Sequence, residues 1–176
     1  EVVYLIFNEG YAATAGDDWL RPALCDEALR LARMLVALAP GEPEALRLQA
    51  LLEIQASRAA ARVDAQGEPV LLADQDRSRW DRLLIRRGLA ALARGEQRCA
   101  EDGQPRGPYL LQAALAACHA RAARAEDTDW PRLCTLYDEL LARQPSPVVA
   151  LNRAVAIGRA RGPAAALPLV QALEAE

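Results

Sequence analysis

The strongest constraint on this sequence is an apolar periodicity of three and four residues that recurs along the chain. This spacing places side chains on one face of an α-helix. Pro and Gly punctuate the pattern, since Gly suits the end of one helix and Pro suits the first turn of the next. The sequence therefore predicts an all-α protein. The apolar stripes fall within residues 24–38, 48–55, 80–92, 111–122, 133–141, 148–158 and 166–173.

The opening run, Val2 to Phe7, differs from the rest because it is β-branched and aromatic, which locally favours a strand. A single strand has no pairing partner elsewhere in the chain. We therefore predict a buried helix here. Its end is expected either near Asn8-Glu9-Gly10 or at Ala15-Gly16-Asp17-Asp18, where small and polar residues interrupt the apolar pattern.

Short connectors between the predicted helices favour antiparallel hairpins. Pro40 and Pro145 each follow a Leu-rich stretch, and Pro43 and Pro147 each open the next one. The chain is 52% hydrophobic but only 5% aromatic, and small Ala and Gly side chains let helices pack closely. We predict one domain over residues 1–176, with hairpins stacked as a degenerate, right-handed array similar to tetratricopeptide (TPR) repeats. Repeat units are expected near residues 20–61, 76–100, 108–145 and 146–176.

Several local signals refine this prediction. Asp129 and Ser146 each stand just before a first turn that contains Pro, so both are expected to cap a helix N-terminus. Pro168 falls inside an apolar stripe, so it should lie in a first turn or kink its helix. The one long connector, residues 64–77, is expected to pack onto the protein through its apolar patch, Val70-Leu71-Leu72.

The charge balance excludes several classes of protein. The net charge is −3, the pI is about 5.3, and all 21 positive side chains are Arg because the chain has no Lys. This balance argues against a nucleic-acid-binding module, and the high hydrophobicity argues against a disordered tail. No stretch approaches the roughly 18 apolar residues of a membrane span. We expect a cytoplasmic protein.

Patterns that carry chemistry are missing from the sequence. The four Cys residues are scattered, so we expect them to be reduced and buried rather than paired or bound to a metal. Cys118 and His119 are adjacent and therefore point about 100° apart on a helix, which rules out a nucleophile–base pair between them. The sequence has no second His and no phosphate-binding or hydrolase motif. We expect no enzymatic activity, no metal and no other cofactor.

Two polar clusters remain as candidates for a functional surface. One is the run from Asp74 to Arg77 with Trp80, and the other places Tyr109, Gln112 and His119 on one helix face. First-helix residues of this kind line the inner groove of helical-repeat proteins, where they bind peptides or another domain. They could equally satisfy one another between packed helices. A further possibility is a small-molecule sensor in which these side chains line a polar pocket between helices.

Six segments, taken in order, resemble the C-terminal extension found in one group of extracytoplasmic-function (ECF) RNA polymerase sigma factors. They are Tyr4–Tyr11, Asp74–Asp81, Gly107–Ala114, Cys118–Ala120, Asp127–Trp130 and Pro145–Ala156. The match covers nearly the whole chain. The positions expected to form an interaction surface or a structural network are Asn8, Glu9, Tyr11, Asp74, Gln75, Asp76, Arg77, Trp80, Tyr109, Gln112, His119, Asn152 and Arg153.

The resemblance implies a function as well as a fold. Such proteins carry two N-terminal regions that bind promoter DNA and polymerase, followed by a TPR-like extension that supports or controls sigma activity. Neither N-terminal region is present in these residues, so the chain looks like an excised C-terminal domain. The expected partners are proteins, namely the sigma regions, RNA polymerase or a signalling protein. Promoter binding would belong to the full-length protein and not to this domain, and no membrane association is expected.

Overall fold

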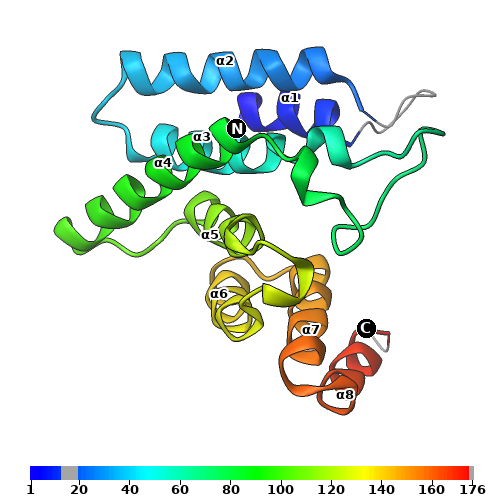
Figure 1. The fold of residues 1–176 in the computed structure, drawn as a ribbon. Helices are drawn as coiled ribbons and strands as arrows, with labels where there is room; N and C mark the ends of the chain where they lie inside the picture. Colours follow the sequence, from blue (N-terminus) through cyan, green and yellow to red (C-terminus); the bar gives the residue numbers. More distant parts are fainter. Residues whose placement is uncertain (13–19, 175–176) are drawn as a thin grey trace. The chain divides into compact units, whose positions relative to one another are not determined.

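The computed structural model describes residues 1–12 and 20–174. Helices dominate this part of the chain (Figure 1), which confirms the all-α prediction, and the described residues contain no strand beyond one isolated bridge between Val63 and Pro69. The α-helices are α1 (Val2–Tyr11), α2 (Pro22–Leu38), α3 (Pro43–Ala56), α4 (Arg82–Glu101), α5 (Pro108–Arg121), α6 (Trp130–Arg143), α7 (Pro147–Arg161) and α8 (Pro163–Glu174). Three short 3-10 helices join them: η1 (Ala59–Ala61), η2 (Arg77–Arg79) and η3 (Ala125–Asp127).

The chain forms two compact units, residues 1–116 and 117–176, and the boundary between them falls inside α5. In the first unit, α1 packs on α2, α2 on α3, and α3 on α4. In the second unit, α6 packs on α7, and α7 on α8. Within α1 to α4 and within α6 to α8, helices that follow one another in the sequence are therefore neighbours in space, as short connectors favour. The TPR-like stacking of these hairpins stays a prediction.

Helix α3 is the centre of the first unit. Every residue from 45 to 54 is buried, including Arg47, Gln49 and Glu53. A helix that is covered on all sides has no solvent-facing stripe, because α2 and α4 both pack against it. The helix begins as predicted, with Pro43 in its first turn and the side chain of Glu42 accepting a hydrogen bond from the backbone N–H of Glu44.

The opening segment is helical as predicted, and α1 ends at Tyr11, just beyond the first of the two expected breaks. The second expected break, residues 15–18, lies outside the described residues. Only part of α1 is buried: Phe7 belongs to the core between α1, α2 and α3, whereas Val2 and Leu5 are exposed. The prediction of a buried helix therefore holds for one face only.

The predicted stripe on α2, formed by Leu24, Ala28, Leu31, Leu35 and Leu38, is wrong in its second half. Leu35 and Leu38 are exposed, and the buried face consists of Cys25, Ala28, Leu29 and Ala32. Two neighbouring stripes of this helix are apolar, so periodicity alone could not choose between them. The choice follows from packing, since this face meets Phe7 of α1 and the leucines of α3 in one core cluster.

Two further expectations need refinement. In the apolar patch of the long connector, Val70 and Leu72 are half-buried, but Leu71 is exposed. The buried anchors of this region are Gln75, Arg77 and Trp80. For Pro168 the first of the two expected alternatives is excluded, because it lies inside α8 as its sixth residue and not in the first turn; the kink stays a prediction. Pro168 has no N–H, so the helix loses one backbone hydrogen bond there.

The two predicted N-caps differ in their hydrogen bonds. Asp129 caps α6, because its carboxylate accepts a hydrogen bond from the backbone N–H of Arg132 at 2.9 Å. Ser146 occupies the N-cap position of α7, but its side chain makes no capping hydrogen bond. The N-cap position was therefore predicted correctly for both residues, but only Asp129 forms a capping hydrogen bond.

Close helix packing depends on Gly at two contacts in the first unit. A Cβ atom at Gly10 would lie 2.7 Å from the backbone nitrogen of Cys25 in α2. One at Gly88 would lie 2.5 Å from Ile54 Cγ1 and 3.0 Å from the Ile54 nitrogen in α3. The distances of 2.7 and 2.5 Å are too short for a real side chain, so these helices approach each other only because the side chains are absent.

We expect Gly88→Ala to lower the free energy of unfolding, because the added methyl group pushes α4 away from α3 at an overpacking cost of about 1–3 kcal/mol. This cost should exceed the gain of about 1 kcal/mol that Ala brings to a helix interior. Urea denaturation followed by circular dichroism measures the change. Gly41→Ala is the matched control, since nothing lies within 4 Å of a Cβ atom at that position. An equal loss in both variants would contradict the packing account.

All four Cys residues are free and buried, which confirms that part of the sequence prediction. Burial, with a smaller contribution from Asp26, raises the pKa of the Cys25 thiol from 9.0 to about 11. The thiol form is therefore favoured in the folded chain, and its contribution to stability is complete below pH 9. It is lost as the pH rises towards 11.

We expect the unfolding free energy to fall by roughly 2 kcal/mol across this alkaline range because of Cys25. Urea denaturation at several pH values measures the slope. Cys25→Ala should flatten the pH dependence, while losing some stability at neutral pH because a small cavity remains. An unchanged slope in Cys25→Ala would show that other groups cause the alkaline loss.

Candidate functional site

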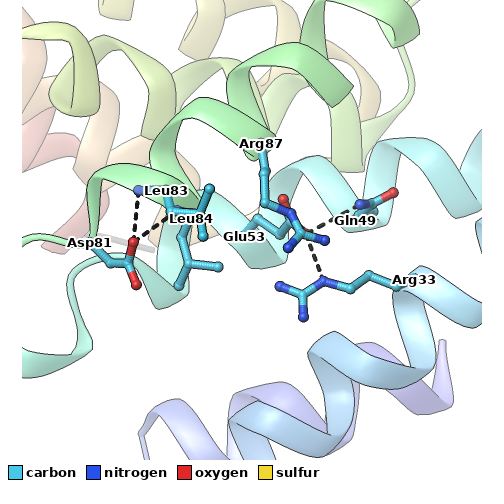
Figure 2. A network of polar contacts seen from close by, with 7 residues as sticks. All are labelled: Arg33, Gln49, Glu53, Asp81, Leu83, Leu84 and Arg87. Atoms are coloured by element: carbon cyan, nitrogen blue, oxygen red, sulfur yellow. Dashed lines mark hydrogen bonds and ion pairs between the residues drawn. The ribbon is translucent and has the colours of Figure 1, made fainter.

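A buried carboxylate ties together three helices of the first unit. Glu53 of α3 is 0% exposed, and its Oε1 accepts a hydrogen bond from Arg33 Nε of α2 at 2.9 Å. Arg87 Nε of α4 lies 3.4 Å from the same oxygen, and Gln49 Nε2 donates to it at 3.2 Å. Figure 2 shows these side chains converging on Glu53 from α2, α3 and α4.

The chemistry of this network is structural. A carboxylate removed from water needs charged partners, and the two guanidinium groups supply them from the partly exposed edges of α2 and α4. The second oxygen, Glu53 Oε2, is buried without a hydrogen-bond partner among the described residues. Sequence analysis missed this network. The available signal was a single acid within the apolar run Leu51-Leu52-Glu53-Ile54.

The cluster from Asp74 to Trp80 organises the start of α4. Asp76 caps η2, accepting hydrogen bonds from the Ser78 hydroxyl at 2.6 Å and the Ser78 backbone N–H at 2.9 Å. These bonds, the hydroxyl one first, hold the pKa of the exposed Asp76 carboxyl below its usual value. Gln75 Nε2 donates to the Val70 carbonyl at 3.2 Å, whereas Asp74 is exposed.

Arg77 and Trp80 of this cluster stack on each other. The Arg77 guanidinium lies 4.6 Å from the centroid of the buried Trp80 ring. Directly after Trp80, the Asp81 carboxylate caps α4 by accepting hydrogen bonds from the backbone N–H groups of Leu83 and Leu84, at 2.8 and 3.0 Å (Figure 2). Of the predicted residues, Arg77 and Trp80 are therefore in contact with each other, and Asp76 caps η2 beside them.

The polar face predicted on α5 divides between the two units. In the first unit, the Tyr109 ring lies 5.2 Å from the Tyr4 ring, and the Tyr4 hydroxyl donates to Gln112 Oε1 at 3.3 Å. Burial is the main cause that raises the pKa of Tyr109. In the second unit, His119 meets the edge of the Trp130 ring at 5.7 Å. Tyr109 and Gln112 thus share Tyr4 as a partner, whereas His119 contacts Trp130.

The remaining candidates lie near the two ends of the chain. Glu9 pairs with Arg21 at 2.9 Å, and the Arg62 guanidinium lies 3.6 Å from the centroid of the Tyr11 ring. In α7, Arg153 forms an ion pair with Asp138 of α6. The side chains of Asn8 and Asn152 are exposed.

The surface that sequence reasoning did not identify is an apolar groove in the second unit. The groove, between α7 and α8, has a volume of about 710 Å³ and one charged lining residue, Arg159. A row of apolar side chains on α7 and α8 is open to solvent at or beside it: Val148 is 67% exposed, Leu151 46%, Val155 51% and Leu167 57%. The groove is lined by Val155, Gly158, Arg159, Pro163, Ala164, Ala166, Leu167 and Val170.

The exposed row corrects the interpretation of the stripe at residues 148–158. Its apolar residues, Val148, Leu151 and Val155, share one face of the helix, yet α7 buries Ala154, Ala156 and Ile157 instead. Apolar side chains that gather on an open surface are typical of binding sites for other proteins. This groove can bury an apolar side chain of a partner. Arg159, the one charged residue that lines it, could orient that partner by an ionic contact.

Other kinds of site find less support in the structure. Among residues 1–12 and 20–174, no three His, Cys, Asp or Glu side chains lie together in a way that could hold a metal ion. None of the helices in that part of the chain is long and apolar enough to cross a membrane.

Together, these features define an all-α protein built from two compact helical units, with an exposed apolar surface on the second. The chain belongs to the DUF6596 family, a family of unknown function, which matches residues 1–96. The uncharacterized protein R00370 of Rhizobium meliloti (strain 1021) is 51% identical over 172 residues. The match covers 98% of this chain and 40% of that protein, so the chain spans less than half of the relative's length. No solved structure matches the chain significantly.

Proposed function

We propose that this chain is a regulatory, protein-interaction domain of an alternative sigma factor of the ECF type. It modulates transcription initiation through contacts with the sigma regions, RNA polymerase or a signalling partner. The observation that carries the interaction role is the exposed apolar row beside the α7–α8 groove. Burial of such a surface favours a complex by about 25 cal/mol for each Å² removed from water, and this gain offsets the entropy lost on association.

The sigma-factor part of the proposal is supported by the ordered resemblance of six segments along the chain. Several of their residues hold the fold together. Trp80 is buried, Asp81 caps α4, and Tyr109 packs against Tyr4. The residues that carry the resemblance therefore include several that stabilise the fold. The Rhizobium relative is long enough to hold further regions beside the matching one.

A small-molecule sensor is the less favoured function. It would need Tyr109, Gln112 and His119 to line one polar pocket. Tyr109 and Gln112 are instead in contact with Tyr4, and His119 is in contact with Trp130. The groove between α7 and α8 is apolar apart from Arg159. These contacts favour a structural role for the polar residues and an interaction role for the groove.

A promoter reporter in the Rhizobium host tests the sigma assignment. Overproduction of the intact relative should activate a set of promoters. Deletion of the region that matches this chain should change their activity by about tenfold, which corresponds to about 1.4 kcal/mol of lost contact free energy. A relative that activates no promoter, or one whose activity is unchanged by the deletion under every condition, would count against the proposal.

The groove itself is tested in a chimera in which this chain replaces the matching region of the relative. The chimera should restore promoter activity, and Val155→Glu combined with Leu167→Glu should remove it, because two buried carboxylates oppose an apolar contact. Leu71→Glu is the control, since Leu71 is 75% exposed on a loop of the first unit. Equal activity of the double variant and the control would overturn the interaction role of the groove.

A further inference from the structure

The outer face of α4 carries a concentration of positive charge that the composition of the whole chain conceals. Residues 82–95 contain four Arg and no Asp or Glu, which gives a local charge of +4 in a chain whose net charge is −3. All four side chains, Arg82, Arg86, Arg87 and Arg94, are exposed. We call them the arginine face. They extend over about 18 Å, because each helical residue advances 1.5 Å.

Most of this charge is not neutralised within the part of the chain that the structure describes. Arg87 pairs with Glu53 at 3.4 Å, and Arg82 Nη2 donates to the backbone carbonyl of Arg77 at 3.3 Å. Arg86 and Arg94 make no ion pair with any described residue. Surface Arg without an acidic partner keeps its capacity to bind carboxylates in a bidentate manner.

The arginines flank an apolar line. Because successive residues on a helix are 100° apart, Arg82 and Arg86 lie on one side of the outer face, and Arg87 and Arg94 on the other. Leu83 and Ala90, seven residues apart, run between the two sides, and both are exposed. Leu83 is 52% exposed although periodicity predicted it in the core. An apolar centre with Arg at its margins is typical of protein interfaces.

We propose that this face binds an amphipathic helix of a partner protein whose apolar stripe is flanked by Asp and Glu. The partner's apolar residues cover Leu83 and Ala90, and its carboxylates meet the arginine face on both sides. A nucleic acid fits less well, because the apolar line offers nothing to phosphates and the net negative charge of the chain opposes a polyanion. The inference goes beyond the proposed function and does not depend on it.

The test uses the purified chain and a synthetic helical peptide of about three heptads, with Leu along one line and Glu on both flanks. Fluorescence anisotropy should show saturable binding that weakens as salt is added. A second peptide, with Gln in place of every Glu, should bind at least about tenfold more weakly. A DNA duplex of about 20 base pairs tests the alternative, and tighter binding to the duplex than to the acidic peptide overturns the proposal.

Variants of the chain locate the contact. Arg82→Glu, Arg86→Glu and Arg94→Glu, combined, should weaken binding of the acidic peptide by about a hundredfold. The control combines the same change at three exposed arginines of the second unit, Arg121, Arg132 and Arg161, and should leave the affinity within about twofold. Circular dichroism melting verifies that both proteins fold. Equal losses in the two triple variants would show unspecific attraction and overturn the assignment to α4.

Leu83→Ser separates helix docking from simple charge attraction. It leaves the charge of the face unchanged but removes the largest apolar group from its centre. We expect affinity for the acidic peptide to fall by about fivefold to tenfold. Unchanged affinity would mean that only the charges attract the peptide, and the docking of an amphipathic helix would then be wrong.

Discussion

Replacing Arg33 and Arg87 together by Met should lower the free energy of unfolding of the first unit by about 3–5 kcal/mol. The double change leaves Glu53 fully buried with Gln49 as its one remaining polar contact among the four side chains of the network. Met is chosen because it retains much of the apolar stem by which Arg packs, so the loss reports the charge and not the packing. Chemical denaturation followed by circular dichroism gives the change.

Two further variants make this prediction specific. Arg86→Met with Arg94→Met removes the same two charges from exposed positions without an acidic partner, and should change stability by no more than about 0.5 kcal/mol. Adding Glu53→Leu to Arg33→Met and Arg87→Met should restore most of the loss, because an apolar group suits the buried position once its partners are gone. A full loss that persists in this triple variant would contradict the ionic account.

Trp80→Ala is expected to cost about 3–5 kcal/mol, the range for removing a buried aromatic side chain. Trp80 is 2% exposed, stacks with the Arg77 guanidinium, and anchors the long connector just before α4. Its loss leaves a cavity at the base of α4 and frees residues 64–77. Limited proteolysis should then cut within this connector before any other described segment, and denaturation should show the lower stability.

Trp80→Phe distinguishes packing from hydrogen bonding at this position. The indole Nε1 is buried and has no hydrogen-bond partner among the described residues. Phe keeps a ring for Arg77 and removes an unsatisfied donor, so we expect a change below about 1.5 kcal/mol. Trp130→Ala, at a half-buried ring, should cost less than Trp80→Ala. Similar losses in Trp80→Phe and Trp80→Ala would show that the N–H matters in a way the structure does not explain.

Local signals in the sequence were sufficient to predict the helices and most of their ends. Pro43 starts α3 and Asp129 caps α6, each because its chemistry acts within a few residues. The helical nature of Val2–Tyr11 also followed, from the lack of a pairing partner for a strand. These features depend on backbone preferences that a short window of sequence contains.

Features that depend on distant contacts could not be predicted in the same way. The phase of α2 was wrong because two apolar stripes compete, and contact with α1 and α3 selects the one through Cys25 and Leu29. Glu53 was overlooked because its partners, Arg33 and Arg87, lie far away in the sequence. Three helices must pack before these charges meet, so no local pattern reveals them.

The arginine face of α4 and the apolar row on α7 and α8 could not be predicted from the sequence for a different reason. The pI of the whole chain does not reveal the arginine face of α4, because acidic residues elsewhere offset its charge. The stripe of Val148, Leu151 and Val155 on α7 has the same periodicity as a stripe that faces a core. A pattern of apolar residues states which side of a helix is apolar, but not whether another helix covers it. Only the packed structure shows that this side of α7 is open to solvent.

Photo-crosslinking in the chimera identifies the protein that contacts the α7–α8 surface. A p-benzoylphenylalanine residue replaces Val155 or Leu167 in the chimera with the Rhizobium relative, and Leu71 in the control. After assembly with RNA polymerase and illumination, we expect crosslinks from positions 155 and 167 to the sigma regions or to a polymerase subunit, and none from position 71. No crosslink from either groove position, in a complex that is fully assembled, would contradict the account.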